Sequence, residues 1–339
     1  MNLLVCGGAG FIGSHFVRQA LRAKGIDKVC VLDALTYAGN FDNFHDLEGV
    51  RFYPGRIQDR IVVDGVIKAE KITHIVNFAA ESHNDRSILE AGSFIQTDVF
   101  GVYTLLEAVR EHKITRFVHV STDEVYGTID NGHFTEESPI EPNTPYSASK
   151  AGGDMQIRAH IKAFKTPALI TRGGNTYGPY QYPEKLVPFF ITRLLEGKKV
   201  PVYGDGSQVR EWIHAYDHAS GIMAVLLYGK DGEIYNVGDV NEQQNMQVVK
   251  VLLEETGRDA SFIKHIPDPR GGAHDKRYSM IAEKSRALGW APEMPFEASL
   301  RATVTWYKNN EWWWSPIISS PSYQDFVTKY YGPTLGEDL

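Results

Sequence analysis

Cysteine is scarce in this sequence: only two occur among 339 residues, and both lie in apolar segments of the first thirty. So few cysteines cannot build the disulfide framework that holds small secreted domains together. A buried thiol behaves as a small hydrophobic side chain, so Cys6 and Cys30 are expected in the core. The cysteine content favours a reducing compartment, and we expect a cytoplasmic protein.

Long apolar runs and blocks of basic charge are missing as well. No uninterrupted apolar stretch approaches the roughly 18 residues of a membrane helix, and the N-terminus carries no basic segment typical of a signal peptide. The formal net charge is -7 and the pI is near 6.0, so we expect neither nucleic-acid nor membrane binding. With 42% hydrophobic residues the chain can bury the cores of two domains, and a small molecule is the expected partner.

The sequence does contain apolar runs that alternate with segments of helical period. The runs of strand length are 3–6, 29–32, 74–78, 117–120 and 168–171, and the helical segments are 11–24, 61–70, 95–111 and 146–164. Strands that are apolar on both faces imply a parallel sheet with helices on each side, which is a doubly wound α/β fold. After Arg172, a Gly/Pro-rich stretch and the aromatic cluster at 312–314 predict a smaller second domain that covers the strand ends.

Glycine is concentrated directly after the first predicted strand, in LLVCGGAGFIGSH. The spacing Gly8-x-Gly10-x-x-Gly13 overlaps a second one that begins at Gly7. Glycines at a strand-to-helix turn let backbone N–H groups approach a pyrophosphate at the positive helix N-terminus. Asp33 follows about twenty residues later, where a carboxylate accepts from ribose hydroxyls and repels a 2′-phosphate. We therefore predict a Rossmann-type site that binds NAD rather than NADP; the alternative is a structural glycine turn with a solvent-exposed acid.

Tyr146 and Lys150 lie four residues apart at the start of a predicted helix. Pro145 suits the first helical turn, and Asn143 or Thr144 can cap it. The spacing places the phenol and the ammonium on one helix face, where the ammonium would lower the phenol pKa and make Tyr146 a usable base. Because the sequence contains 17 tyrosines, the same spacing also arises by chance, and a surface pair is the alternative.

Two adjacent acids, Asp123 and Glu124, follow the apolar run 117–120. Successive residues of a strand point to opposite faces, so the two carboxyls can serve one site only from the turn or first helical residues beyond the strand. Ligands bind at the carboxyl ends of parallel strands, which favours a catalytic role. Acids at a helix N-terminus also interact favourably with the helix dipole, so the residues alone leave both interpretations open.

The sequence as a whole resembles the nucleotide-sugar 4,6-dehydratases of the extended short-chain dehydrogenase/reductase family. The similar segments lie between residues 1 and 314 and include FAAESHNDRS, STDEVYG, YSASK, YPEKLVP, VREWIH and HDKRY. The similarity is greatest to family members that act on dTDP-glucose. The resemblance implies an NAD-dependent lyase that oxidises C4, eliminates water across C5 and C6 and returns hydride to C6, so that the product is dTDP-4-keto-6-deoxyglucose.

The resemblance also implies a role for each site residue. Tyr146, helped by Thr122, takes the proton of the 4-hydroxyl, and Lys150 assists it beside the nicotinamide. Glu124 removes the C5 proton, and a protonated Asp123 donates to the departing 6-hydroxyl. Together with Tyr146 and Lys150, the residues expected at the cofactor are Gly7, Gly10, Phe11, Ile12, Gly13, Asp33, Ala34, Leu35, Thr36, Ile57, Phe78, Ala79, Ala80, Ser82, Thr97 and Thr176. Substrate contacts are expected at Ser82, Thr122, Asn175, Lys185, Leu186, Pro201, Tyr203, Arg210, Asn245 and His274.

Several positions depart from the family pattern. Arg56 stands where an aspartate usually meets the adenine, Asn84 replaces a valine, and Asp98 replaces an asparagine. The other departures are Cys6, Gly173, Gly174, Thr176, Asp239, Val240 and an extra residue near Arg270. The alternatives are therefore a UDP-sugar 4,6- or 5,6-dehydratase, acting on UDP-glucose or UDP-N-acetylglucosamine, a 4-epimerase, and a non-catalytic NAD-binding sensor. Epimerases lack the acid pair, and a sensor has no need of it.

The domain division and the assembly are further expectations. We expect an NAD-binding domain of residues 1–172 and 214–240 and a nucleotide-sugar-binding domain of residues 173–213 and 241–330. The helices at 95–111 and 146–164 correspond to those that pair in dimers of the family, so the resemblance implies a homodimer. His83 and Asp85 do not belong to a cluster with metal-ligand spacing, and no metal is expected.

Overall fold

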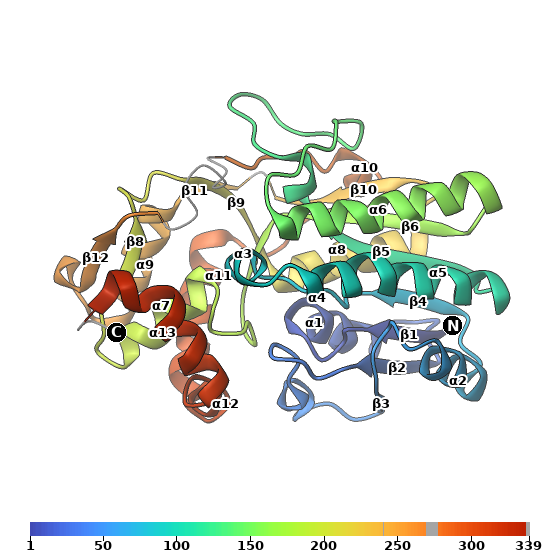
Figure 1. Ribbon diagram of the computed structural model, residues 1–339, viewed down its shortest axis with the longest axis horizontal. Coiled ribbons are helices and arrows are strands. Elements are labelled where there is room, and N and C mark those ends of the chain that lie inside the picture. Colours follow the sequence, from blue (N-terminus) through green and yellow to red (C-terminus); the bar gives the residue numbers. More distant parts are fainter. Residues whose placement is uncertain (240, 269–276, 337–339) are drawn as a thin grey trace.

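A seven-stranded parallel sheet forms the centre of the computed structural model, which describes residues 1–239, 241–268 and 277–336 (Figure 1). The spatial order is β10-β6-β5-β4-β1-β2-β3, and each neighbouring pair is parallel. The strands are β1 (Asn2–Cys6), β2 (Lys28–Asp33), β3 (Val50–Pro54), β4 (His74–Asn77), β5 (Arg116–Thr122), β6 (Ala168–Gly173) and β10 (Ile234–Val237). This is the strand order of a doubly wound dinucleotide-binding sheet, so the predicted α/β fold is confirmed.

Helices cover both faces of this sheet. One layer contains α1 (Phe11–Ala20) and α8 (Ala215–Tyr228), and the other contains α2 (Arg60–Glu70), α5 (Val102–Glu111) and α6 (Pro145–Phe164). Along β1, Leu3 and Val5 lie in the core beneath α1, whereas Leu4 and Cys6 lie in the core beneath α2 and α5. This alternation is the two-residue period of a strand buried on both faces. Cys6 and Cys30 are buried and free, as expected.

The segment 95–111, which the sequence predicts as one regular helix, has two parts. Residues Ile95–Gly101 form a π-helical segment, η2, which follows the short α4 (Gly92–Phe94), and only then does α5 begin. A Cβ on Gly101 would lie 2.6 Å from Cδ1 of Ile57, and one on Gly152 would lie 2.8 Å from Cγ2 of Val99. The change of helical form thus coincides with close contacts to α6 and to the segment before α2. The spacing of apolar residues along one segment of the sequence does not indicate such contacts between separate segments.

A second core lies beyond the carboxyl ends of the parallel strands, at the left of Figure 1. It surrounds a three-stranded sheet, β11-β9-β7, and a two-stranded sheet, β12-β8. The strands are β7 (Asn175–Tyr177), β8 (Val200–Tyr203), β9 (Val209–His214), β11 (Glu242–Gln244) and β12 (Ile263–Ile266). The helices are α7 (Leu186–Leu195), α9 (Asn245–Thr256), α11 (Phe296–Asn309), α12 (Glu311–Ile318) and α13 (Pro321–Leu335), and α10 (Glu283–Arg286) lies beside β10. Within the described ranges, no helix combines the length and apolar character needed to cross a bilayer.

One buried amide joins the end of the chain to its beginning. The indole N–H of Trp313, on α12, donates to Oδ1 of Asn43 at 2.9 Å. The side-chain nitrogen of Asn43 donates in turn to the carbonyl oxygen of Ala9 at 2.8 Å, inside the glycine-rich turn. Trp313 and Asn43 are both almost fully buried. The aromatic cluster predicted for the second domain therefore also supports the turn that follows β1.

Candidate active site

A cavity of about 420 Å³ lies between the carboxyl ends of the parallel strands and the second core. Its walls come from the glycine turn after β1, the ends of β2, β4, β5 and β6, the start of α6, and residues of β8, β9 and α9. Every residue that the sequence assigns to cofactor, catalysis or substrate lines it, except Leu35 and His274. His274 lies outside the described residues. A cleft at this edge of a doubly wound sheet is the usual place for a ligand.

The turn after β1 packs so closely against the neighbouring backbone that side chains do not fit at two of its glycines. Gly7 has a φ of +72°, and a Cβ there would lie 2.4 Å from the backbone nitrogen of Ala79. A Cβ on Gly13 would lie 2.4 Å from the carbonyl oxygen of Gly7. Gly10 precedes α1 and brings no side chain to cap the free N–H groups of its first turn. These N–H groups face the position where a pyrophosphate binds in such turns, so the turn fits a dinucleotide.

Asp33 ends β2 at the rim of the same cavity and is 8% exposed. Its two carboxylate oxygens accept from the backbone N–H groups of Ala9 and Leu35 at 2.9 and 2.8 Å. Burial raises the pKa of Asp33, and these two hydrogen bonds oppose the shift. Each oxygen keeps a lone pair for a ribose hydroxyl. Leu35 itself does not line the cavity: its side chain is 40% exposed, and its backbone acts by orienting Asp33.

The acid pair lies on a 3₁₀ turn, η3 (Asp123–Tyr126), directly after β5, as the strand argument required. Thr122 caps this turn: its hydroxyl accepts from the backbone N–H of Glu124 at 3.2 Å and donates to Oδ1 of Asp123 at 3.2 Å. Asp123 is buried, and its Oδ2 has no hydrogen-bond partner among the described residues. Burial, followed by the charges of Glu124 and Glu211, holds the pKa of Asp123 well above its usual range. The protonated form of Asp123 is therefore favoured, beside a neighbouring carboxyl that is only half-buried.

Tyr146 and Lys150 lie on the first turns of α6 and face the same cavity. Thr144 provides the N-cap through a reciprocal capping box with Ser147, which confirms one of the two caps expected. Lys150 is 3% exposed, and its Nζ donates to the carbonyl oxygen of Val120 at 2.8 Å. Burial lowers the pKa of Lys150, and the charges of Asp98 and Asp154 oppose this shift.

The expectation of a lowered phenol pKa is wrong for the chain alone. Burial first, and then the charges of Glu124 and Asp98, hold the pKa of Tyr146 well above its usual value, and a hydrogen bond with Thr122 only partly offsets them. The spacing of Tyr146 and Lys150 gives no sign of these carboxyls. They reach the phenol from η3, directly after β5, and from η2, so their effect depends on the fold.

Basic and aromatic residues line the side of the cavity near the second core. Arg210, on β9, is 5% exposed, and its guanidinium carbon lies 4.7 Å from the centre of the Tyr278 ring. Lys185 precedes α7 and donates from Nζ to the carbonyl oxygen of Ser82. Asn245, the first residue of α9, has a buried Oδ1 that lacks a hydrogen-bond partner within the described part of the chain. This wall thus combines two cations with an acceptor that a ligand N–H group can satisfy.

One cluster of potential metal ligands occurs in the described ranges, outside this cavity. It consists of Asp64, Glu111 and His112. Arg60 donates from Nε to Asp64 at 2.8 Å and from Nη2 to Glu111 at 2.6 Å, and His112 contacts the same oxygen of Asp64 at 2.7 Å. These contacts describe an ion-pair network around a guanidinium.

Most of the chain matches a known family. A family model described as GDP-mannose 4,6 dehydratase matches residues 4–303. The chain belongs to this dehydratase family. Among its relatives, a dTDP-glucose 4,6-dehydratase of Streptomyces niveus is 46% identical over 94% of this chain and 96% of its own length. The low-salt glycan biosynthesis protein Agl12 of Haloferax volcanii is 48% identical over 92% of this chain and 100% of its own length. A crystal structure of DesIV, a dTDP-glucose 4,6-dehydratase from Streptomyces venezuelae with NAD and dTDP bound, is similar with a TM-score of 0.90 at 48% identity, and the match covers 94% of this chain and 100% of that chain.

In this member of the dehydratase family, Arg56 and Asn84 are two of the cavity residues that stood out in the sequence only as departures from the pattern. Arg56 lines the cavity near Ile57, on the side of the predicted adenine position. Asn84 lines it near the acid pair and donates from Nδ2 to Oε2 of Glu124 at 2.7 Å. The departures marked both positions as unusual, but the sequence did not say what either side chain contacts. Tyr278 and Glu81 also line the cavity; they lie in the similar segments HDKRY and FAAESHNDRS, but the sequence analysis assigned neither of them to the site.

Proposed function

We propose that this protein is an NAD-dependent hydro-lyase that converts dTDP-glucose to dTDP-4-keto-6-deoxyglucose. The observation that carries the proposal is the adjacent acid pair: Asp123 is buried with a raised pKa, and Glu124 is half-buried, in the cavity that also contains the glycine turn, Tyr146 and Lys150. An elimination needs a base that acts at one carbon of the substrate and an acid that acts on the leaving group of the neighbouring carbon. Two close carboxyls with different surroundings can supply both. The family membership and the relatives named above support this reaction.

NAD is the cofactor that the cavity residues fit. The turn around Gly7, Gly10 and Gly13 would hold the pyrophosphate, and Asp33 would accept from the adenosine ribose. Bound NAD supplies a reversible hydrogen acceptor and donor beside the sugar. Because oxidation and reduction balance within one turnover, we expect the cofactor to stay bound and no net redox change to occur.

Tyr146 removes the proton of the sugar 4-hydroxyl when C4 is oxidised. Its hydrogen bond with Thr122 holds the phenol at the end of β5, and the buried ammonium of Lys150 lies one helical turn further along α6. The positive charge of an oxidised nicotinamide would oppose the burial and the carboxyls that raise the pKa of Tyr146 in the chain alone. The resulting 4-ketone makes the C5 hydrogen acidic.

Glu124 and Asp123 then perform the elimination. The Glu124 carboxylate takes the C5 proton, and Asp123 donates its proton to the departing 6-hydroxyl, which leaves as water. Asp123 would act as the acid, because burial and its like-charged neighbours raise its pKa and so favour its protonated form. A proton returns to C5 in the final reduction.

The wall near the second core would anchor the nucleotide. Lys185 and Arg210 provide the positive charge for a diphosphate, and Pro201, Tyr203 and Asn245 would surround the base. The unsatisfied Oδ1 of Asn245 is matched by the imide N–H of a pyrimidine. These assignments rest on position in the cavity and on charge.

The test uses the purified protein without added NAD. Incubation with dTDP-glucose should give a product that has lost one water by mass spectrometry and that shows the alkaline absorbance of a 4-keto-6-deoxy sugar. The same assay is run with UDP-glucose and UDP-N-acetylglucosamine. Loss of water from a UDP-sugar alone would move the substrate to that class, and bound NAD without loss of water from any sugar would favour a sensor.

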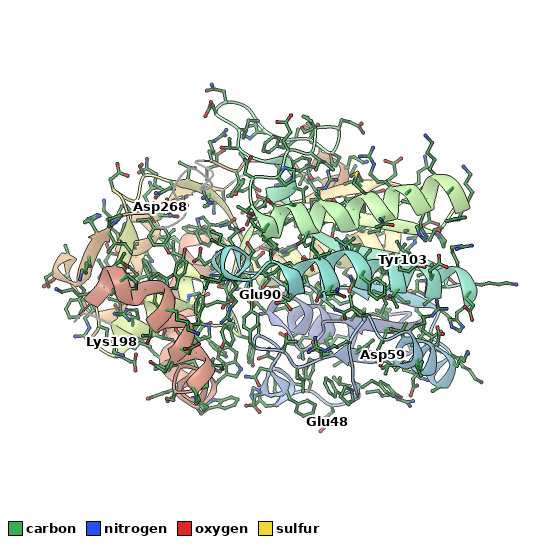
Figure 2. The ribbon with its side chains drawn as sticks, viewed as in Figure 1. Glu48, Asp59, Glu90, Tyr103, Lys198 and Asp268 are labelled. Carbon is green, nitrogen blue, oxygen red and sulfur yellow. The ribbon has the colours of Figure 1, made fainter. Side chains whose placement is uncertain are left out.

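We also infer a homodimer formed through η2, α5 and α6. These elements carry large hydrophobic side chains on the surface of the chain: Ile95, Phe100, Tyr103, Met155 and Phe164 are all at least 40% exposed. Figure 2 labels Tyr103 on α5, next to α6. Exposed apolar side chains gathered on neighbouring helices fit a surface that a second copy covers.

The division into an NAD-binding unit (1–172 and 214–240) and a nucleotide-sugar unit (173–213 and 241–330) is likewise our proposal. It is supported by the separate cores on the two sides of the cavity. A cytoplasmic location is in keeping with the two buried, free thiols.

A further inference from the structure

A short hydrogen-bond chain connects the start of α6 to the elimination acids. Asn84 is the first residue of α3 (Asn84–Leu89) and is half-buried at the cavity wall. Its Nδ2 donates to Oε2 of Glu124 at 2.7 Å, and its Oδ1 accepts from the hydroxyl of Thr144 at 2.8 Å. Thr144 is the N-cap of the helix that carries Tyr146. The amide thus bridges two segments that each bring a reacting side chain to the cavity.

Two contacts set the orientation of the Asn84 amide. The hydroxyl oxygen of Thr144 accepts from the backbone N–H of Ser147 at 3.1 Å, and its proton can donate to Oδ1 of Asn84 at 2.8 Å or to Oγ of Ser147 at 2.9 Å. A flipped amide would place its oxygen 2.7 Å from an oxygen of the Glu124 carboxylate, which has no proton to donate. The amide nitrogen therefore faces Glu124, and the amide oxygen faces Thr144.

Asn84 makes the surroundings of the two acids unequal. Glu124 accepts a hydrogen bond from the Asn84 amide, which fixes one of its oxygens. Asp123 has no comparable amide donor: its Oδ1 accepts only from Thr122, and its Oδ2 has no partner among the described residues. Adjacent carboxyls need such a difference before one can act as a base and the other as an acid.

We propose that Asn84 is a positioning residue that holds the Glu124 carboxylate oriented for removal of the C5 proton. The inference rests on the proposed function and adds a residue to its machinery. The residues of the family pattern do not supply this contact, because a valine at this position has neither the donor nor the acceptor. In this chain the orientation of the Glu124 carboxylate therefore depends on α3 and on the N-cap of α6, as well as on η3.

The test compares Asn84→Asp and Asn84→Val with the unsubstituted holoenzyme by rapid mixing with dTDP-glucose. Asn84→Asp is isosteric and can still accept from Thr144, but it places an oxygen against Glu124, and Asn84→Val restores the family residue. We expect the rate of water elimination to fall about 10-fold in Asn84→Val and about 100-fold in Asn84→Asp. KM and the initial oxidation should change little, so the near-ultraviolet absorbance of the reduced nicotinamide should build up in both variants.

Ile88→Asn, an exposed position on the same helix, is the control and should give the trace of the unsubstituted chain. Thermal unfolding and the amount of bound NAD show whether each variant is folded. Equal elimination rates in Asn84→Val, Asn84→Asp and the unsubstituted chain would overturn the role of Asn84, as would an equal loss of oxidation and elimination in folded variants. If the unsubstituted chain gives neither absorbance change nor water loss, the proposed function fails instead, and the inference fails with it.

Discussion

At the scale of single residues, the two adjacent carboxyls of the site, those of Asp123 and Glu124, have different surroundings. Asp123 is turned into the protein beside Glu211, whereas Glu124 stays at the cavity wall and accepts from Asn84. The strand ends at Thr122, so both side chains leave the alternating geometry of a strand and can reach one ligand. This arrangement predicts that the two steps of the reaction respond differently to substitutions of the pair.

Glu124→Gln should slow water elimination by at least about 100-fold, because an amide cannot take the C5 proton. The initial oxidation should persist, since Tyr146 and Thr122 are unchanged. Rapid mixing that follows reduced nicotinamide, combined with mass spectrometry of the product, separates the two steps. Glu137→Gln, at an exposed position outside the cavity, is the control. Simultaneous loss of both steps in a folded Glu124→Gln variant would contradict the separate roles.

Asp98 should make the stability of the fold depend on pH. Burial raises its pKa from 3.8 to about 6, although Lys150 and a hydrogen bond from Ser149 oppose the shift. The folded chain therefore binds a proton that the unfolded chain has lost, and the free energy of unfolding falls as the pH rises from 3.8 to about 6. Asp98→Asn, the residue usual in the family, should remove about 2–3 kcal/mol of this decline.

Denaturant unfolding between pH 4 and pH 7 measures this effect. Asp130→Asn, at an exposed position, should leave the pH dependence as it is. An identical slope for Asp98→Asn and the unsubstituted chain would show that Asp98 ionises in the folded state as it does in the unfolded one.

How far the sequence predicts the site depends on how local each relation is. Gly7 and Asp33 follow from spacing along β1, α1 and β2, and the Tyr146–Lys150 pair follows from spacing within one helix; all of them line the cavity. The bond from Asn84 to Glu124 joins residues 40 positions apart and exists only once α3 meets η3. The catalytic roles themselves stay predictions until the variants are measured.

At the scale of elements, α6 packs against η2 so closely that only glycine fits between them. A Cβ on Gly153 would lie 2.5 Å from the carbonyl oxygen of Asp98, which is a backbone atom and cannot rotate away. The π-helical form of η2 lies at this contact. The sequence predicted both helices but gave no sign of the π-helical segment, because the contact that accompanies it joins separate segments.

Gly153→Ala should therefore destabilise the protein by about 2 kcal/mol or more, despite the better helix propensity of alanine. The matched control is Gly65→Ala in α2, where the added Cβ meets nothing within 4 Å. That substitution should stabilise the protein by about 0.5–1 kcal/mol. Urea unfolding of both variants tests the pair, and a stabilising Gly153→Ala would show that α6 and η2 can move apart without loss.

At the scale of the whole molecule, η2, α5 and α6 carry exposed apolar side chains on the outer surface of the helix layer that covers one face of the sheet. Phe100 and Tyr103 lie with their ring centres 6.0 Å apart on this surface. Phe100→Glu should convert a dimer to a monomer, because two such charges would be buried without partners in a symmetric interface. Ile61→Glu, on α2, introduces the same charge at an 85% exposed position and should leave the dimer intact.

Light scattering after size-exclusion chromatography gives the molar mass of each variant. A monomeric unsubstituted chain, or a dimer that survives Phe100→Glu, would rule out this interface.

The hydrogen bonds from Trp313 to Asn43 and from Asn43 to Ala9 affect the order in which parts of the protein become stable during synthesis. The glycine turn is made within the first thirteen residues of synthesis, yet one of its carbonyl oxygens is held by an amide whose own partner is 270 residues further along the chain. During translation, the turn receives this support only after α12 has emerged from the ribosome. Tight capture of the cofactor should therefore be a late event in biogenesis, and a nascent chain stalled before residue 313 should release NAD more readily than the finished protein.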